Sequence, residues 1–385
     1  MKYLVLGSGL MGRAVAFDLV QSEDTTEVRL ADIDIHKVNE ISKWINNSKI
    51  KPLRLDVTNS AQVLSAMEGV DSVIGCISYK FNYDLTKAAI QSKANFCDLG
   101  GNNTVVQKQF SLHSEAKDAA VTIIPDCGLA PGVASVIVTA GVEQFDSLDE
   151  IHIRVGGLPQ NPKPPLYYSL IFSVQGLTNE YIEIAEVIRD GKITHVESLT
   201  EIESLIFPEP FGELEAFQTS GGTSTLPKTL LGKVNVLDYK TIRYKGHCEK
   251  IKTIFDLGFN NEEKIDFKGC KISPREFLEY MLVKSLTHKD NKDVTLVRIS
   301  ITGQKDNSKQ KLTYQIIDYF DDKNNISSMM RMTAYPASII AQMMAKGIIE
   351  KKGVITQEFN VPSQLMLEEL RKRKIVIDEN WESLV

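Results

Sequence analysis

The sequence predicts an α/β protein in which a doubly wound parallel sheet is followed by a second, α+β domain. Through residues 1–124, short apolar segments alternate with helical ones, which indicates a parallel sheet covered by helices on both faces. Beyond this, segments such as 151–155 and 297–302 alternate strictly between apolar and polar residues, as strands with one solvated face do. The length of 385 residues is sufficient for two such domains.

The first strand and the turn after it carry the most informative motif. Residues 2–6 are apolar and run into Gly7-Ser8-Gly9-Leu10-Met11-Gly12, after which a helix over 13–21 and a strand over 27–31 lead to Asp32. Strand, G-x-G-x-x-G, helix, strand and acid in this order are the fingerprint of a Rossmann-type dinucleotide site. The helix N-terminus favours the pyrophosphate, and the acid accepts hydrogen bonds from the ribose. We therefore predict dinucleotide binding; the alternative is a glycine-rich turn with a purely structural role.

Asp32 also bears on which dinucleotide binds. A carboxylate at this position repels the 2′-phosphate of NADP, and NADP sites usually place an arginine nearby. The residues that follow are Ile33-Asp34-Ile35-His36, with no arginine among them. NAD is therefore the predicted cofactor, and Lys37 leaves NADP open as the alternative.

The α/β rhythm continues to residue 124. We expect strands over 51–55, 71–76, 95–98 and 121–124, with helices over 83–91 and 105–119. With the first two strands they complete a dinucleotide-binding sheet, whose ligand lies beyond the carboxyl ends of the strands. Asp56 ends one strand and is expected either to reach the adenine or to cap a helix with Ser60. The predicted cofactor-binding residues are Gly7, Gly9, Leu10, Met11, Gly12, Asp32, Asp56, Val57, Ile77 and Ser78.

Two acids follow buried strands at the same edge. Asp98 and Asp126 each come shortly before glycine, so each either caps a turn or faces the nicotinamide and the substrate. A carboxylate that faces the nicotinamide and the substrate could anchor an ammonium group or accept a proton. We expect Tyr79, Gly100 and Leu129, which occupy this edge as well, to contact the substrate.

The second domain is expected to contain an antiparallel or mixed sheet. A strand over 312–320 is followed by Asp321-Asp322-Lys323-Asn324-Asn325, which reads as a hairpin turn into another strand. Long loops are expected over 156–165 and 208–222, and helices over 334–345 and 363–374. The predicted division is a dinucleotide-binding domain over 1–130, a substrate-binding and dimerisation domain over 131–330, and C-terminal helices over 331–385.

One polar cluster in this second domain suggests substrate chemistry. Alternation along Thr241-Ile242-Arg243-Tyr244-Lys245-Gly246-His247 places Thr241, Arg243 and Lys245 on one strand face. Arg243 suits a bidentate clamp on a carboxylate, and His247 could titrate near neutrality and move protons. The alternative is a solvated strand end. Thr219 opens a glycine-rich loop that either binds the substrate or only connects two elements.

Composition excludes several classes of partner. The net charge is −6 without basic runs, so nucleic acid is not expected, and no apolar stretch reaches the ~18 residues of a membrane span. The first apolar segment is too short for a signal peptide. The five cysteines lack C-x-x-C spacing and the six histidines are scattered, which favours reduced thiols in the cytoplasm and no metal site.

Several motifs in order resemble those of the saccharopine dehydrogenase family, and most closely its lysine 6-dehydrogenase branch. They are the turn over 7–12, Asp126-Cys127-Gly128-Leu129-Ala130-Pro131-Gly132, Gly156-Gly157-Leu158-Pro159, the loop over 219–225, the segment over 241–247 and Lys352-Gly353-Val354. The resemblance implies a Rossmann domain, a central domain that supplies much of the substrate site and the dimer contact, and C-terminal helices that pack back near the first domain. It also implies a homodimer or larger homo-oligomer and a small amino-acid substrate.

The lysine 6-dehydrogenase branch implies a particular reaction. NAD oxidises the ε-amino carbon of L-lysine to 2-aminoadipate 6-semialdehyde, which cyclises to piperideine-6-carboxylate, and ammonia is released. In this reading Arg243 binds the α-carboxylate, Asp98 or Asp126 binds the amines, and His247 transfers protons during imine hydrolysis.

Two departures disfavour saccharopine as the substrate. Glutamate-forming saccharopine reductases carry an acid where this chain has Ala130, and they tend to have a cysteine where it has Val155. The alternatives that stay open are a saccharopine dehydrogenase or reductase, a related enzyme acting on another imine such as a carboxyalkyl polyamine, and a non-enzymatic NAD-binding redox sensor.

Overall fold

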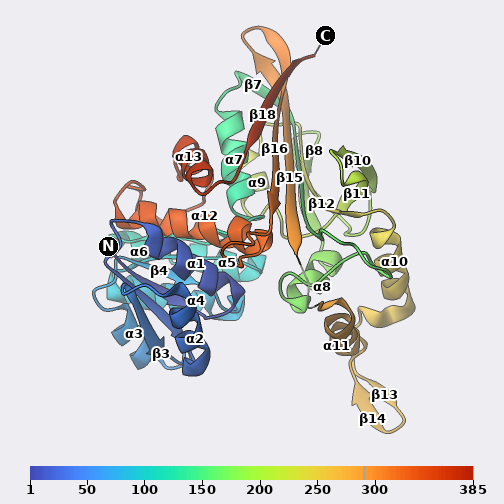
Figure 1. The fold of residues 1–385 in the computed structure, drawn as a ribbon. Helices are drawn as coiled ribbons and strands as arrows, with labels where there is room; N and C mark the ends of the chain where they lie inside the picture. The colour runs from blue at the N-terminus through green and yellow to red at the C-terminus, as the bar shows by residue number, and fades with distance from the viewer. Residues whose placement is uncertain (289–291, 385) are drawn as a thin grey trace. The chain divides into compact units, whose positions relative to one another are not determined.

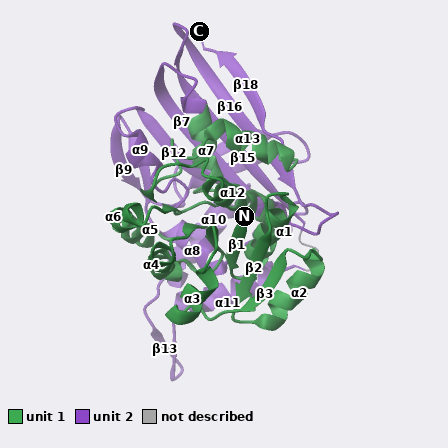
Figure 2. Ribbon diagram, turned by 90° about the vertical axis from the view of Figure 1, so that its left-hand side faces the viewer, with its two compact units in different colours: residues 1–140, 330–375 green, residues 141–329, 376–385 purple. Residues whose placement is uncertain are grey.

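The structure is a computed structural model that describes residues 1–288 and 292–384 (Figure 1). The chain divides into two compact units, drawn in different colours in Figure 2. Unit 1 comprises residues 1–140 and 330–375, and unit 2 comprises residues 141–329 and 376–385. The two crossings, after 140 and after 329, lie near the predicted boundaries at 130 and 330, but the last ten residues return to unit 2.

Unit 1 is built on a parallel sheet of seven strands in the order β17-β6-β5-β4-β1-β2-β3. The reversal of strand order on either side of β1 is that of a doubly wound dinucleotide-binding sheet, so the predicted fold class is confirmed. The bounds are β1 Lys2–Leu6, β2 Glu27–Asp32, β3 Ile50–Arg54, β4 Ser72–Gly75, β5 Asn95–Asp98, β6 Thr122–Ile124 and β17 Gly353–Val354. β17 adds a short strand from the C-terminal part of the chain to the edge of this sheet.

Helices connect the strands of unit 1, and three of them, α2, α3 and α5, begin at a polar side-chain cap. Asp34 accepts the backbone N–H groups of His36 and Lys37, and Asn59 and Asn102 cap the next helices in the same manner. The bounds are α1 Leu10–Gln21, α2 Ile35–Ile45, α3 Ser60–Met67, α4 Asn82–Ser92, α5 Asn103–Phe110, α6 His113–Asp118, α7 Val133–Val142, α12 Ser328–Ala345 and α13 Ser363–Lys372, with a 3₁₀ turn η1 over Tyr79–Phe81. The single helix predicted over 105–119 is wrong, because the chain breaks it into α5 and α6.

Unit 2 contains a mixed sheet of nine strands. Seven follow the order β10-β11-β12-β7-β15-β16-β18, and β8 and β9 pair beside β12; β12 and β7 are parallel and the other pairs are antiparallel. The bounds are β7 Ser147–Pro159, β8 Ala185–Arg189, β9 Lys192–Val196, β10 Glu203–Phe207, β11 Gly212–Gln218, β12 Val236–Tyr244, β15 Asp293–Lys305, β16 Ser308–Tyr319 and β18 Asp378–Ser383. The expected mixed sheet is thereby confirmed.

Four predictions of local structure in unit 2 are wrong. β7 extends through Gly156–Pro159, a segment that is buried throughout and shows no alternation, and β11 occupies part of the loop expected over 208–222. The turn after β16 leads into α12 instead of another strand. Residues 378–383 form β18 on this sheet, not a part of the C-terminal helices.

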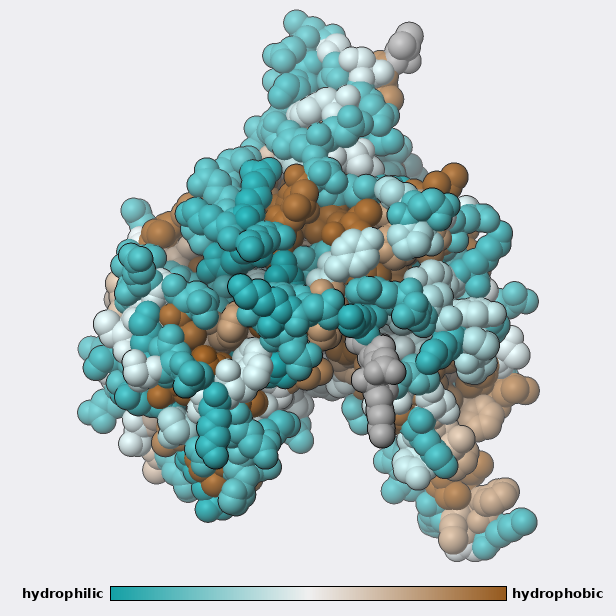
Figure 3. Space-filling model, viewed as in Figure 1, coloured by the Kyte–Doolittle hydropathy of each residue, from teal (hydrophilic) through white to brown (hydrophobic). Residues whose placement is uncertain are grey.

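The remaining elements of unit 2 are helices around the sheet and a separate two-stranded hairpin. They are α8 Val174–Ile182, α9 Leu226–Leu230, α10 His247–Ile254, the π-helical turn η2 Phe255–Phe259, α11 Pro274–Leu286, and a hairpin of β13 Ile265–Phe267 and β14 Cys270–Ile272. The hairpin exposes apolar side chains, including those of Ile265 and Phe267 (Figure 3). Within the described residues, no helix is both long enough and apolar enough to cross a membrane.

Candidate functional site

The turn between β1 and α1 has the shape that a pyrophosphate requires. A Cβ on Gly7 would lie 2.6 Å from the Cys76 carbonyl oxygen, and one on Gly12 would lie 1.9 Å from the Gly7 carbonyl oxygen. Gly9, by contrast, has no atom within 4 Å of such a Cβ. The turn is therefore closely packed on its protein side and open at Gly9. Leu10 and Met11 begin α1 without a side-chain cap at Gly9, so the helix N-terminus can donate to an anion.

Asp32 closes the turn from the end of β2. Its Oδ2 accepts the Ser8 N–H at 2.7 Å and the Ser8 hydroxyl at 2.9 Å, and its Oδ1 accepts the Asp34 N–H at 3.1 Å. Partial burial opposes ionisation, but these hydrogen bonds outweigh it and hold the pKa of Asp32 below its ordinary value. An ionised carboxylate is thus in place for a ribose hydroxyl.

The structure adds a cation that the local sequence does not show. Arg54 is the residue of β3 directly paired with Asp32 of β2 in the parallel ladder. Its side chain is exposed. An arginine beside the ribose-binding acid is the kind of group that accommodates a 2′-phosphate.

The other residues predicted for the cofactor occupy the neighbouring strand ends. Asp56 accepts the N–H and the hydroxyl of Thr58 at 2.9 and 2.7 Å, which stabilises a turn, and Asn59 rather than Asp56 caps α3. Val57 and Ile77 pack against the core of the unit. Ser78 is exposed just before η1. The adenine contact proposed for Asp56 stays a prediction.

Asp98 holds the loop that follows β5. It is 0% exposed, and its carboxylate accepts the Gly100 N–H at 2.8 Å, the Asp126 N–H at 3.3 Å and the Gln109 side-chain amide at 2.7 Å. Burial raises the pKa of Asp98 although these donors oppose the rise. Of the two roles expected for Asp98, this geometry favours the turn cap over a carboxylate that faces the substrate.

Asp126 lies next to that loop in an unusual backbone conformation. Its φ is 62°, and its Oδ1 lies 1.8 Å from where a Cβ on Gly100 would be, so only glycine fits at position 100. Tyr79 packs similarly against Gly101, and Leu129 is buried in the segment after β6. The structure therefore brings these predicted residues together at one edge of the sheet in unit 1.

The second cluster lies in unit 2 around Arg243, which is 3% exposed at the end of β12. Its Nε donates to the Tyr181 hydroxyl at 3.0 Å and its Nη1 to the Ile242 carbonyl at 2.9 Å. The guanidinium lies 4.7 Å from the centre of the Tyr168 ring. Among the residues that the structure describes, no carboxylate forms an ion pair with Arg243, and Nη2 donates no hydrogen bond.

His247 orients this cluster and does not titrate as expected. Its Nδ1 donates to the Leu166 carbonyl at 2.9 Å, which leaves Nε2 to accept from the Tyr181 hydroxyl at 3.1 Å. Burial and the nearby Arg243 charge lower the pKa of His247 to about 3. The prediction that His247 titrates near neutrality is therefore wrong: the ring is neutral and positions Tyr181 against Arg243. Lys245, expected on the same face, is exposed and pairs with Glu213 at 2.9 Å.

Sequence reasoning did not identify Tyr181 or three further residues of this cluster. Tyr168 is buried with its hydroxyl unpartnered among the described residues, and Tyr239 lies on the same face of β12 as Arg243. Glu180 lies at the end of α8, and its charge acts on Arg243 and on all three tyrosines of the cluster. The acid at 180 has no motif around it, and only the packing of α8 beside β12 assembles these groups.

The glycine-rich loop that Thr219 opens closes over the cluster. The Thr219 and Thr241 hydroxyls lie 2.7 Å apart, and a Cβ on Gly222 would lie 2.5 Å from the Tyr239 ring. The loop is therefore packed onto the Arg243 face of β12. Thr219 and Arg243, both predicted to bind substrate, belong to one local assembly.

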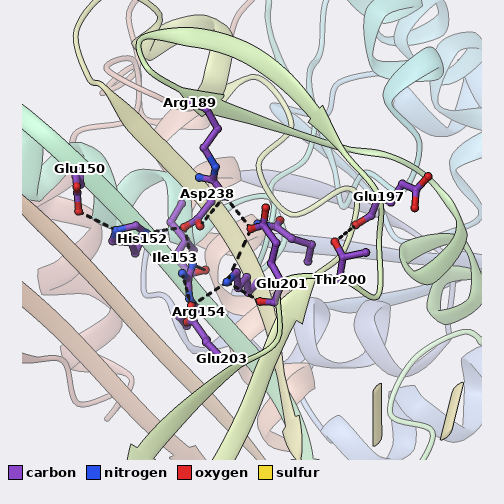
Figure 4. A network of polar contacts seen from close by, with 12 residues as sticks. Glu150, His152, Ile153, Arg154, Arg189, Glu197, Thr200, Glu201, Glu203 and Asp238 are labelled. Atoms are coloured by element: carbon purple, nitrogen blue, oxygen red, sulfur yellow. Dashed lines mark hydrogen bonds and ion pairs between the residues drawn. The ribbon is translucent and has the colours of Figure 1, made fainter. Parts of the chain in front are cut away.

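The opposite face of β12 carries charges of a different kind. Asp238 on that face accepts from Arg154 at 2.7 Å and from His152 at 2.7 Å, and Arg189 also reaches it (Figure 4). Glu203 pairs with Arg154 and, at 2.9 Å, with Lys240. Here cations and carboxylates are matched within the protein, which is typical of a structural ion-pair network. Arg243 has no such match.

Two family models match the chain. The saccharopine dehydrogenase NADP binding domain matches residues 3–124, and the saccharopine dehydrogenase C-terminal domain matches residues 128–376. A saccharopine dehydrogenase (NADP(+), L-glutamate-forming) of Pyricularia oryzae is 26% identical over 69% of this chain. A carboxyaminopropylagmatine dehydrogenase of Synechocystis is 21% identical over 93% of this chain and 92% of its own length. The chain spans 59% of the Pyricularia relative and 65% of its Saccharomyces cerevisiae counterpart.

One solved structure has the same fold along its whole length. The apo saccharopine dehydrogenase (L-Glu forming) from Saccharomyces cerevisiae superposes with a TM-score of 0.83, covers 99% of each chain and is 20% identical.

Proposed function

Because the chain belongs to the saccharopine dehydrogenase family, we propose that it is a nicotinamide-dependent oxidoreductase whose substrate is the amino acid L-lysine. The proposed reaction oxidises the ε-carbon, after which water displaces ammonia and leaves 2-aminoadipate 6-semialdehyde. The semialdehyde then cyclises to piperideine-6-carboxylate.

The buried guanidinium of Arg243 supports this proposal most directly. A buried charge without a carboxylate partner is unfavourable, so its retention suggests that an anion from outside the protein completes the site. Nη2 and the second N–H of Nη1 are directed away from the contacts with Tyr181 and Ile242 and can form the paired hydrogen bonds that a carboxylate accepts. The α-carboxylate of an amino acid has this chemistry.

The residues of unit 1 fit a nicotinamide dinucleotide. Gly9 and the start of α1 would hold the pyrophosphate, and Asp32 would bind the adenosine ribose. The bound dinucleotide would supply the hydride acceptor. We propose NAD rather than NADP because Asp32 is ionised. Arg54 beside it and the NADP-dependent activity named for the Pyricularia relative favour NADP instead.

The protein's own groups have separate tasks in this mechanism. Arg243 binds the carboxylate, while Tyr181 and neutral His247 hold the guanidinium in its plane. The ε-ammonium of lysine, with an ordinary pKa of about 10.4, must lose a proton before hydride leaves the adjacent carbon. Asp126 is our candidate for contacting that reacting amine. Hydride loss leaves a substrate imine, to which water adds before the C–N bond breaks and ammonia departs.

A second candidate follows from the relatives. The Synechocystis relative, which the chain matches over nearly its full length, is named for a carboxyaminopropyl derivative of agmatine, and the Pyricularia relative is named for saccharopine. Ala130 and Val155 disfavour saccharopine, but neither bears on the polyamine class.

The test is a spectrophotometric assay of reduced nicotinamide. Purified protein is mixed at alkaline pH with NAD and L-lysine, and NADP and saccharopine are tested in parallel. Reduction of NAD with lysine alone is the expected result. Reduction with saccharopine and not with lysine would contradict the substrate, and reduction of NADP only would contradict the cofactor.

A further inference from the structure

Glu215 of β11 is the acid that the strand register places opposite Arg243. The two residues are Cα partners in the antiparallel pair of β11 and β12, so their side chains lie on the same face of the sheet. Glu215 is buried, with 7% of its surface exposed. Among the described residues no ion pair joins the two, although opposite charges in directly opposed positions attract each other. The carboxylate of Glu215 is bound by a different partner.

That partner is the backbone turn between β12 and α10. Oε2 of Glu215 accepts the Gly246 N–H at 2.7 Å, and Oε1 accepts the Cys248 N–H at 2.7 Å. Gly246 has a φ of 85° and no side chain, so α10 begins without a cap from its own segment. The carboxylate from the neighbouring strand therefore satisfies two N–H groups at the positive end of the helix.

The two N–H groups lie on either side of His247. Glu215 thus holds the backbone before and after this residue, and Phe217, two positions along the same strand face, stacks on the imidazole with ring centres 6.3 Å apart. From Nε2 of His247 the contacts continue to the Tyr181 hydroxyl and from there to Nε of Arg243. A continuous series of contacts in unit 2 therefore leads from Glu215 to the guanidinium.

We propose that Glu215 is a positioning residue for substrate binding, because it fixes His247 and, through Tyr181, the orientation in which Arg243 binds a carboxylate. This inference rests on the proposed function for the role of Arg243. The turn occupies both oxygens of Glu215, so the acid opposite Arg243 does not neutralise it, and the guanidinium stays available to the substrate. Glutamine cannot replace the acid, since its amide offers one acceptor oxygen and turns an N–H group toward the second donor.

The experiment compares Glu215→Gln with the matched control Glu213→Gln. Glu213 lies two positions away on the same face of β11, but it is exposed and pairs with Lys245 at 2.9 Å. Circular dichroism and thermal unfolding show whether each variant folds. If Glu215→Gln does not fold, Glu215→Asp takes its place, because its carboxylate is one methylene shorter and cannot reach both N–H groups.

The first measurement is steady-state kinetics with L-lysine at saturating NAD. We expect Glu215→Gln to raise the KM for L-lysine by roughly 10-fold with a smaller change in kcat, and the control to leave both unchanged. In the double variant with His247→Gln, the KM should be no higher than in His247→Gln alone, since the effect of Glu215 passes through His247.

The second measurement requires no turnover. Nitrogen NMR of the imidazole distinguishes the two neutral tautomers, and His247→Gln identifies the signal among the six histidines. In the wild type the proton should be on Nδ1, as the contact with the Leu166 carbonyl requires, and Glu215→Gln should shift this signal. Titration with acetate, a simple carboxylate, should give a roughly 10-fold weaker affinity in Glu215→Gln than in the wild type and the control.

The outcomes separate this proposal from the proposed function. If Glu215→Gln unfolds more easily but keeps the wild-type KM, acetate affinity and His247 signal, Glu215 only caps α10 and the proposal is wrong. Additive effects of Glu215→Gln and His247→Gln on the KM would overturn it as well. If lysine is not oxidised but acetate binding and the His247 signal depend on Glu215, the positioning role stands and the proposed reaction is wrong.

Discussion

Three side chains of unit 2 differ in charge state although they lie in one cluster. Arg243 stays cationic, because the neighbouring tyrosines and Glu180 raise its pKa against the effect of burial. His247 is neutral at any physiological pH, and Glu180 titrates near neutrality. The residue that changes charge at neutral pH is thus the glutamate, whereas reference pKa values would have pointed to the histidine.

Arg243 can be tested by its effect on substrate affinity. We expect Arg243→Gln to raise the KM for L-lysine by roughly 100-fold with a smaller change in kcat, since a charge-assisted pair contributes about 3 kcal/mol. Steady-state kinetics with saturating NAD measures both constants. An unchanged KM would mean that the carboxylate is bound elsewhere.

Asp32 can be tested by cofactor preference. In Asp32→Ser the acceptor for the ribose hydroxyls is weakened and the repulsion of a 2′-phosphate is removed, so kcat/KM for NAD should fall by roughly 10- to 100-fold while that for NADP rises. Arg54→Ala should lower kcat/KM for NADP and leave kcat/KM for NAD unchanged. A variant at 32 that keeps the wild-type ratio of NAD to NADP would refute the assignment of Asp32.

At the scale of elements, strand pairing explains both successes and omissions. Alternation along β12 correctly predicted that Thr241 and Arg243 share a face, because neighbours two apart on one strand are a local property. The pairing of Arg54 with Asp32 depends on the register of β3 against β2, and the contact of Tyr181 with Arg243 depends on how α8 packs. Neither relation has a signature within a short window of sequence.

The helices α1, α12 and α13 are joined by one buried contact in unit 1. Asp18 of α1 accepts from Arg373 at 2.7 and 3.0 Å and from the Ser338 hydroxyl at 2.7 Å. Asp18 is nearly inaccessible to solvent, and its removal would leave the guanidinium of Arg373 with Glu369 as its remaining ion-pair partner among the described residues. This contact connects residues 355 positions apart in the chain.

We expect Asp18→Ala to lower the free energy of unfolding of unit 1 by about 3 kcal/mol, the range found when one partner of a buried pair is removed. The exposed pair of Asp84 and Lys87 provides the control, and Asp84→Ala should cost no more than about 1 kcal/mol. Urea denaturation followed by circular dichroism measures both. Equal effects of the two substitutions would show that the Asp18 contact is not stabilising.

For the whole molecule, we expect the free energy of unfolding to decrease as the pH falls, because of His247. Its pKa is about 3 in the folded protein and about 6.5 when unfolded, so the unfolded chain takes up a proton first as the pH falls. The stability associated with the neutral ring is present above pH ~6.5 and is lost progressively below it, at up to ~1.4 kcal/mol per pH unit.

The measurement compares the urea midpoint of the wild type with that of His247→Gln between neutral pH and pH ~5. We expect the wild type to lose stability more steeply than the variant, which has no proton to bind at this position. Parallel slopes would show that His247 binds a proton equally in the folded and unfolded states.

Homo-oligomerisation remains a prediction as well, and sedimentation of the intact chain tests it.

The fold class and the dinucleotide turn can be predicted from the amino-acid sequence alone, because both depend on short-range patterns: strand and helix periodicity, and glycines at fixed spacing before an acid. The sequence also predicts that Arg243 binds the substrate, and that role stays a prediction. The neutral state of His247, the capping of a loop by Asp98 and the contact of Tyr181 with Arg243 become visible only in the folded chain. Desolvation and charge–charge effects depend on which distant segments pack together, and that packing is a property of the folded chain.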